Sequence, residues 1–205
     1  MVVQLPLDFT SIRGDVLSQS NFPVREAIEI LSRLRVSAGL LVPTATGLNK
    51  SIMDAHSSLR AYLRQQGVHD FSVQAKGSDA KRVLPAYVVE PSRLARTTLS
   101  LYRPLTKAGD PRIWISRLKT HAHANDLLAL VAHNGRVYVI NMSRTEVRQS
   151  LADSRSPFRQ ALLDHEATPQ ALQELLYRLA GIARQGFVRS LRAGPTGVGK
   201  TEVAK

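Results

Sequence analysis

SLYRPLTKAGDPRIWISRLKTHAHANDLLALVAHNGRVYVINMS, residues 100–143, is the stretch that decides the fold. Its second half contains two apolar runs, Leu127–Ala132 and Val137–Ile140, on either side of Asn134 and Gly135. An Asn-Gly pair tolerates the positive φ angles that both central positions of a type I′ turn require, so the pattern predicts a two-residue β-hairpin loop. Both faces of the hairpin are apolar, and we therefore expect other parts of the chain to cover it on both sides.

The first half of the same stretch is rich in basic residues. Pro104, Gly109 and Pro111 interrupt it, which is typical of turns. One interpretation is a solvated loop, and the other is a positive surface that a rigid β scaffold presents to a ligand. On the second interpretation, the candidate ligand-binding residues are Arg103, Lys107, Arg112, Arg117 and Lys119.

The composition limits the classes of function. The 205 residues suffice for one sizeable domain with a substantial core, and the absence of cysteine excludes disulfides, thiolate zinc sites and iron–sulfur clusters. The formal net charge is +12, and such an excess attracts polyanions, of which nucleic acid is the commonest partner for a domain this basic. No apolar run approaches the roughly 20 residues of a membrane span. We therefore expect a soluble, cytoplasmic protein with no membrane partner.

Apolar spacing predicts helices on both sides of the hairpin and strands that lead into it. A helix is expected at Pro23–Arg35 and a second from about Leu48 to Gln65, with residues 39–46 as a linker. A strand is expected at Arg82–Glu90, where Pro85 indicates an edge or a bulge. The other expected elements are a strand at Thr97–Tyr102 and helices at Thr145–Leu151, Pro157–Asp164 and Pro169–Gln185. Together they predict an α+β domain with a mostly antiparallel sheet around a central Asn-Gly hairpin, packed with amphipathic helices.

Several polar or aromatic residues have both a structural and a functional interpretation. Trp114, the only tryptophan, is expected in the core rather than as a base-stacking platform. Asp54 and His56 are expected to form a polar edge of the second helix rather than a hydrolytic cluster. His121 and His123 have no carboxylates at metal-ligand spacing, so we expect a solvent-exposed pair and no metal site.

The string GPTGVGKT at residues 194–201 formally matches the nucleotide-binding pattern G-x-x-x-x-G-K-[ST]. Its candidate nucleotide-binding residues are Gly194, Gly199, Lys200 and Thr201. Such a loop follows a buried strand, yet Arg189 and Arg192 place charges where that strand would be most apolar. We therefore expect no cofactor site in this chain. The string is also similar to the nucleotide-binding loop of the Clp-type protein-unfolding ATPases, so a nucleotide-binding ATPase fragment remains an alternative.

Six strings follow one another along the chain: TGLNKSIMDA at 46–55, VHDF at 68–71, SLYRP at 100–104, TKAGDPRIW at 106–114, NDLLALV at 125–131 and RVYVIN at 136–141. Together they resemble the MvaI/BcnI-like type II restriction endonucleases, particularly members with a region ahead of the nuclease domain. The resemblance extends roughly over residues 41–201, because RSLRAGPTGVGKT at 189–201 is similar to the segment that opens those nuclease domains.

The resemblance implies three regions. They are an N-terminal lead-in and helix at 1–40, an α+β accessory domain at 41–186 and a truncated start of the nuclease domain at 187–205. In the family, Pro-Asp and Glu-x-Lys residues hold Mg²⁺ and activate water for phosphodiester hydrolysis, and neither motif occurs at the corresponding place in this chain. We therefore expect a fragment of a longer nuclease or a shortened reading frame, without catalytic or metal-binding residues, although Mg²⁺ is expected for the full-length family nuclease.

On this hypothesis the chain is a DNA-binding accessory or specificity region of a type II site-specific deoxyribonuclease. Its expected partners are double-stranded DNA and the missing nuclease domain. The basic residues Arg103, Lys107, Arg112, Arg117 and Lys119 would contact phosphates, which position a protein without conveying sequence. Besides the ATPase fragment, a protein-interaction module remains as an alternative, in which the apolar hairpin pairs with the missing nuclease half.

Overall fold

The computed structural model describes residues 22–163. These residues belong to the first of the two units into which the chain divides, Met1–His165 and Glu166–Lys205. The expected helix at Pro169–Gln185 and the loop at 194–201 lie outside the described residues. In chain order the elements are α1 (Val24–Arg33), β1 (Gly39–Leu41), α2 (Ala45–Lys50), β2 (Ile52–Asp54), α3 (Ser57–Gln65), β3 (Arg82–Val89), β4 (Leu94–Tyr102), the 3₁₀ turn η2 (Lys107–Gly109), β5 (Arg112–Ile115), the 3₁₀ turn η3 (Leu118–Thr120), β6 (Leu128–His133), β7 (Arg136–Asn141), α4 (Thr145–Ala152) and α5 (Pro157–Leu163).

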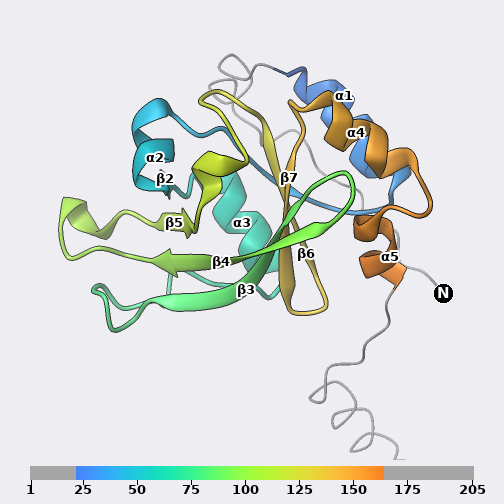
Figure 1. Cartoon of the computed structure of the whole chain (residues 1–205). Helices are drawn as coiled ribbons and strands as arrows, with labels where there is room; N and C mark the ends of the chain where they lie inside the picture. The colour runs from blue at the N-terminus through green and yellow to red at the C-terminus, as the bar shows by residue number, and fades with distance from the viewer. Residues whose placement is uncertain (1–21, 164–205) are drawn as a thin grey trace, which may run out of the picture. The chain divides into compact units, whose positions relative to one another are not determined.

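The strands form one sheet in the order β1-β6-β7-β3-β4-β5-β2. Every neighbouring pair is antiparallel except β3 and β7, so the expected α+β class with a mostly antiparallel sheet is confirmed. β6 and β7 pair with His133 opposite Arg136, and Asn134 and Gly135 between them have positive φ angles. In Figure 1 these two strands run steeply across the direction of β3, β4 and β5, so the sheet is strongly curled.

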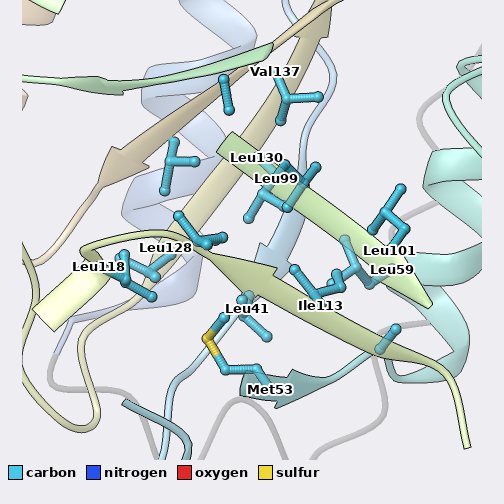
Figure 2. Packing of buried hydrophobic residues seen from close by; sticks show 14 of the residues in the cluster. Leu41, Met53, Leu59, Leu99, Leu101, Ile113, Leu118, Leu128, Leu130 and Val137 are labelled. Atoms are coloured by element: carbon cyan, nitrogen blue, oxygen red, sulfur yellow. The ribbon is translucent and has the colours of Figure 1, made fainter. Parts of the chain in front are cut away.

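Helices cover this sheet on both faces. On one face, Leu59 and Leu63 of α3 pack against apolar residues of the strands. Figure 2 shows part of this core, with Leu101 and Ile113 near Leu59 and with Leu128 near Leu118. On the other face, α1, α4 and α5 cover mainly β1, β6 and β7 (Figure 1). The apolar hairpin is therefore covered on both sides as expected, and its two edges pair with β1 and β3.

The expected single helix over residues 48–65 is wrong. Ser51 adopts a left-handed conformation with φ 52° and ends α2, and the next three residues pair with β5 as an edge strand. His56 then begins α3 as its N-cap, with Nδ1 accepting a hydrogen bond from a backbone N–H of the first turn. All three elements bury side chains in the same core, and apolar spacing alone cannot separate such a sequence of short elements from one helix.

Residues 39–46 are not a linker. They contain β1, which pairs with β6, and the start of α2. The expectation for Pro85 agrees with the pairing, because β7 borders β3 only from Ala86 onward. Pro85 therefore lies in a part of β3 that has a partner strand on one side, where proline is tolerated.

Candidate nucleic-acid interface

One face of β2, β3, β4 and β5 has no described helix over it. In β4, Leu99 and Leu101 contribute to the core under α3, while Thr98 and Ser100 belong to the opposite face, because side chains alternate along a strand. In Figure 1, β3 and β4 lie in front of α3, and no described helix lies in front of them. We call this side of the strands the open face, and its residues are Ile52, Asp54, Val83, Pro85, Arg96, Thr98, Ser100, Tyr102, Arg112 and Trp114, of which Ser100 is buried.

Trp114 lies on β5, the strand between β4 and β2, and belongs to the open face. The sheet register places it opposite Ser100 on one side and Ile52 on the other. Its exposed fraction is 40%, so the expectation that it belongs to the core is wrong. The reason is again alternation: Ile113 and Ile115 occupy the core-facing positions of β5, which leaves Trp114 on the opposite face.

A lysine accompanies the aromatic rings of the open face. Lys81 Nζ lies 4.3 Å from the ring centroid of Trp114 and 5.9 Å from that of Tyr102. Cation–π contacts at exposed sites are weak, so an arriving ligand can displace the ammonium group or use it. Burial raises the pKa of Tyr102, so its phenol is neutral at physiological pH. This corner combines two aromatic rings with the positive charge of Lys81.

Arg103, the first of the five predicted phosphate-contacting residues, is held by the protein itself. Its Nε donates to the carbonyl oxygen of Gly109 at 2.9 Å, and its Nη1 makes longer contacts, of 3.5 and 3.4 Å, to the carbonyl oxygens of Phe71 and Gln74. The guanidinium group therefore joins the connection between β4 and β5 to the segment after α3. It has a structural role whether or not it also meets a ligand.

Arg112 is compensated by carboxylates. Its side chain is 16% exposed and pairs with Asp54 of β2 and, at 4.0 Å, with Asp110. Asp54 was expected on a helix edge, but it lies on β2 opposite Arg112 because the helix is interrupted. A hollow of about 510 Å³ between α2 and the residues after β4 adjoins this ion pair and Tyr102.

The other three predicted residues lie in the turns at either end of β5. Lys107 is in η2, before the strand. Arg117 and Lys119 follow the strand and are exposed, and Arg117 precedes η3 with a left-handed φ of 57°. The structure thus separates the five candidates into Arg103 and Lys107 before β5, Arg112 at its first residue, and two residues after it. At about 3.3 Å per residue, Arg112 and Arg117 are about 17 Å apart along the chain.

Sequence reasoning missed two cations of this region, Lys81 and Arg96. Arg96 is exposed on β4, where it pairs with Tyr87 of β3. Within residues 22–163, no carboxylate lies within 4 Å of the side-chain nitrogens of Lys81, Arg96 or Arg117. The alternation of Leu99 and Leu101 with polar residues was the available signal for an uncovered face.

Histidines do not assemble a second candidate site. His121 Nδ1 lies 3.1 Å from Glu90 Oε1 and its side chain is 16% exposed, so only His123, at 91%, fits the expected solvent-exposed pair. Among the described residues, no group of three or more His, Asp or Glu side chains is arranged to hold a metal ion. No helix in the described part of the chain is long and apolar enough to cross a membrane.

No family model, no curated protein and no solved structure matches this chain. Residues 22–163 contain 21 of the 28 Lys and Arg but only 10 of the 16 Asp and Glu. Most of the net positive charge therefore belongs to the part of the chain that the structure describes. An uncovered sheet face with an exposed tryptophan and uncompensated cations can contact a polyanion that has flat apolar groups.

Proposed function

We propose that the chain is a DNA-binding accessory region of a site-specific deoxyribonuclease, without catalytic residues of its own, and that it binds double-stranded DNA through the open face. The observation that carries the proposal is the exposed ring of Trp114 in the middle of that face. Nucleic-acid-binding surfaces combine positive side chains along the phosphate backbone with aromatic rings that contact bases or sugars. Lys81 supplies such a positive charge beside Trp114, and Arg96 supplies another farther along β4.

The spacing of the cations supports a contact along the DNA backbone. Lys81 Nζ lies over the ring of Trp114, which the register places opposite Ser100 of β4. Arg96 is four residues before Ser100 on the same strand, or about 13 Å away at about 3.3 Å per residue. The two cations could therefore contact different phosphates of one DNA strand and fix the position of the protein, with Trp114 at the Lys81 end of the contact.

Two of the five residues first considered contribute less on this proposal. Arg103 is engaged by carbonyl oxygens and Arg112 by carboxylates, whereas Arg117 and Lys119 are exposed beyond the end of β5. With Lys81 and Arg96 this makes about four phosphate contacts. Log affinity should then fall against log salt with a slope of about −3.6, since each contact contributes about −0.9.

The link to MvaI/BcnI-like restriction endonucleases rests on the ordered strings, while the proposal for the open face stands without it. A separate test is to read the genomic DNA past the codon for Lys205. A frame that encodes Pro-Asp and then Glu-x-Lys supports the nuclease family, and one that encodes the magnesium-binding and sensor motifs of an ATPase contradicts it. The alternative in which the hairpin docks on another chain is less favoured, because β6 and β7 are covered on both faces and paired on both edges.

Fluorescence anisotropy with a labelled DNA duplex tests the open face. Trp114→Ala should weaken binding by about 1–3 kcal/mol, or about 5- to 150-fold, and Arg96→Gln should reduce the salt slope by about one. Arg25→Gln, on α1, is the matched control for loss of one charge and should change the affinity little. Because Trp114 is the only tryptophan, its intrinsic fluorescence reports contact directly. Wild-type affinity in both open-face variants, or binding insensitive to salt, would contradict the proposal.

A further inference from the structure

A second group of uncompensated cations lies between α3 and the connection from β4 to β5. There a cavity of about 300 Å³ is lined by Arg60 and Arg64 of α3 and by Arg103. This volume is at the small end of the range for ligand pockets. The polar side chains of Ser57, Asp70 and Ser72 complete the lining. Arg60 and Arg64 had no role in the interpretation of the sequence.

The lining has a formal charge of +2, from three guanidinium groups and one carboxylate. In the described part of the chain, no carboxylate lies within 4 Å of the guanidinium nitrogens of Arg60, Arg64 or Arg103. The Oδ1 atom of Asp70 accepts hydrogen bonds from the hydroxyl and the backbone N–H of Ser72, at 2.7 and 2.8 Å. These bonds, and to a smaller extent the positive charge of Arg64, lower the pKa of Asp70. The carboxylate therefore stays ionised, with its Oδ1 atom directed to its own turn.

The three arginines line the same cavity. The carbonyl contacts of Arg103 to Gly109, Phe71 and Gln74 hold its guanidinium in position before any ligand arrives. Arg60 and Arg64 are four residues apart on α3, so they lie on one side of the helix and repel each other. An anion between them relieves this repulsion. Ser57 begins the helix, so the positive end of its dipole lies at the same cavity.

We infer that this cavity binds the phosphate group of a phosphomonoester, with Arg60, Arg64 and Arg103 donating hydrogen bonds to its oxygens. A phosphomonoester carries about −1.5 to −2 charges at pH 7, which matches the +2 of the lining, whereas a phosphate inside a DNA strand carries one. Guanidinium groups suit this ligand because their N–H donors match the geometry of phosphate oxygens. The inference does not rest on DNA binding by the open face.

Titration with inorganic phosphate, followed by backbone amide chemical shifts, tests the cavity. The wild-type protein should show saturable shifts in α3 and in the segment around residues 70–72, weaker near pH 5 than near pH 7.5 because phosphate loses its second charge at about pH 6. The double variant Arg60→Gln/Arg64→Gln should lose at least about tenfold in affinity. The double variant Arg25→Gln/Arg33→Gln, on α1, removes the same charge and should change it less than about twofold. Arg103 is left intact because its replacement would disturb the fold.

Oligonucleotides with a 5′-phosphate or a 5′-hydroxyl identify the source of the phosphate group. Tighter binding of the 5′-phosphorylated strand, lost in Arg60→Gln/Arg64→Gln and kept in Trp114→Ala, assigns the cavity to a DNA end. Equal binding of the two strands together with saturable inorganic phosphate binding assigns it to a small phosphorylated molecule. The inference is overturned if phosphate does not saturate the wild-type protein, or if the α3 and α1 double variants lose affinity equally.

Discussion

The hydroxyl group of Tyr62 connects three parts of the fold and provides the sharpest prediction of stability. It donates to the carbonyl oxygen of Ser37 at 3.1 Å and accepts from the backbone N–H of Ala132 at 2.8 Å. β1 begins opposite Leu130, so Ala132 of β6 lies beyond the end of its neighbouring strand. The phenol therefore takes the place of a strand partner, in a side chain that is only 8% exposed.

Replacing Tyr62 with phenylalanine keeps the ring and removes both hydrogen bonds. Each net bond is worth about 0.5–1.5 kcal/mol, and an N–H left without a partner in a buried place costs about 1–3 kcal/mol. We expect the free energy of unfolding to fall by about 1.5–3 kcal/mol. For a chain of this size the midpoint temperature should fall by about 3–12 °C, at about 2–4 °C per kcal/mol.

Urea unfolding, followed by circular dichroism, measures this loss, and the denaturant slope should stay unchanged because the folded core is the same. Tyr102→Phe is the matched control, since no described residue forms a hydrogen bond with the Tyr102 hydroxyl, and it should change stability by less than about 0.5 kcal/mol. If Tyr62→Phe loses no more than the control, the hydroxyl does not support the sheet edge and the reasoning is refuted.

Three further perturbations have expected outcomes. Gly39→Ala places a Cβ 2.4 Å from Leu59 Cδ1, so overpacking should destabilise the protein by about 1–3 kcal/mol in urea, and wild-type stability would contradict the close approach. Burial lowers the pKa of His56, so the unfolded chain takes up the proton first, and stability that is complete above about pH 6.5 is lost as the pH falls. Between about pH 7.5 and pH 5.5, the free energy of unfolding should fall more for the wild type than for His56→Asn, which keeps an N-cap. Equal falls in the two proteins would show that His56 is not the source of the pH dependence. Asp54→Asn frees Arg112, so duplex DNA should bind a few-fold more tightly with a salt slope steeper by about one, and an unchanged slope would show that Arg112 does not meet phosphate.

Elements governed by neighbouring residues were predictable. α1, α4 and α5 lie where the apolar spacing places them, and β3 and β4 lie in the regions where strands were expected. Short-range packing within a helix or a strand is enough to produce these periodic patterns. The class of fold, α+β with a mostly antiparallel sheet, follows from the same information.

Elements governed by distant residues were not predictable in the same way. Residues 52–54 form β2 because β5, about sixty residues later, supplies its hydrogen-bonding partner. Pairing with β5 therefore decided the structure of residues 52–54, although the apolar residues on either side of them have helical spacing. Trp114 became exposed for a related reason, since the side of β5 that meets the core was decided by pairing with β4 and β2.

The sequence by itself determined the net charge of +12, which is the basis for expecting a polyanionic ligand. Only the tertiary structure decided where that charge remains available. Arg112 is compensated by Asp54 of β2, about sixty residues earlier, as well as by the neighbouring Asp110. Arg60, Arg64 and Arg103 line one cavity although about forty residues separate α3 from Arg103. The physical reason is that the electrostatic and hydrogen-bonding partners of a guanidinium group are set by distance in space, and the chain brings them together only when it folds.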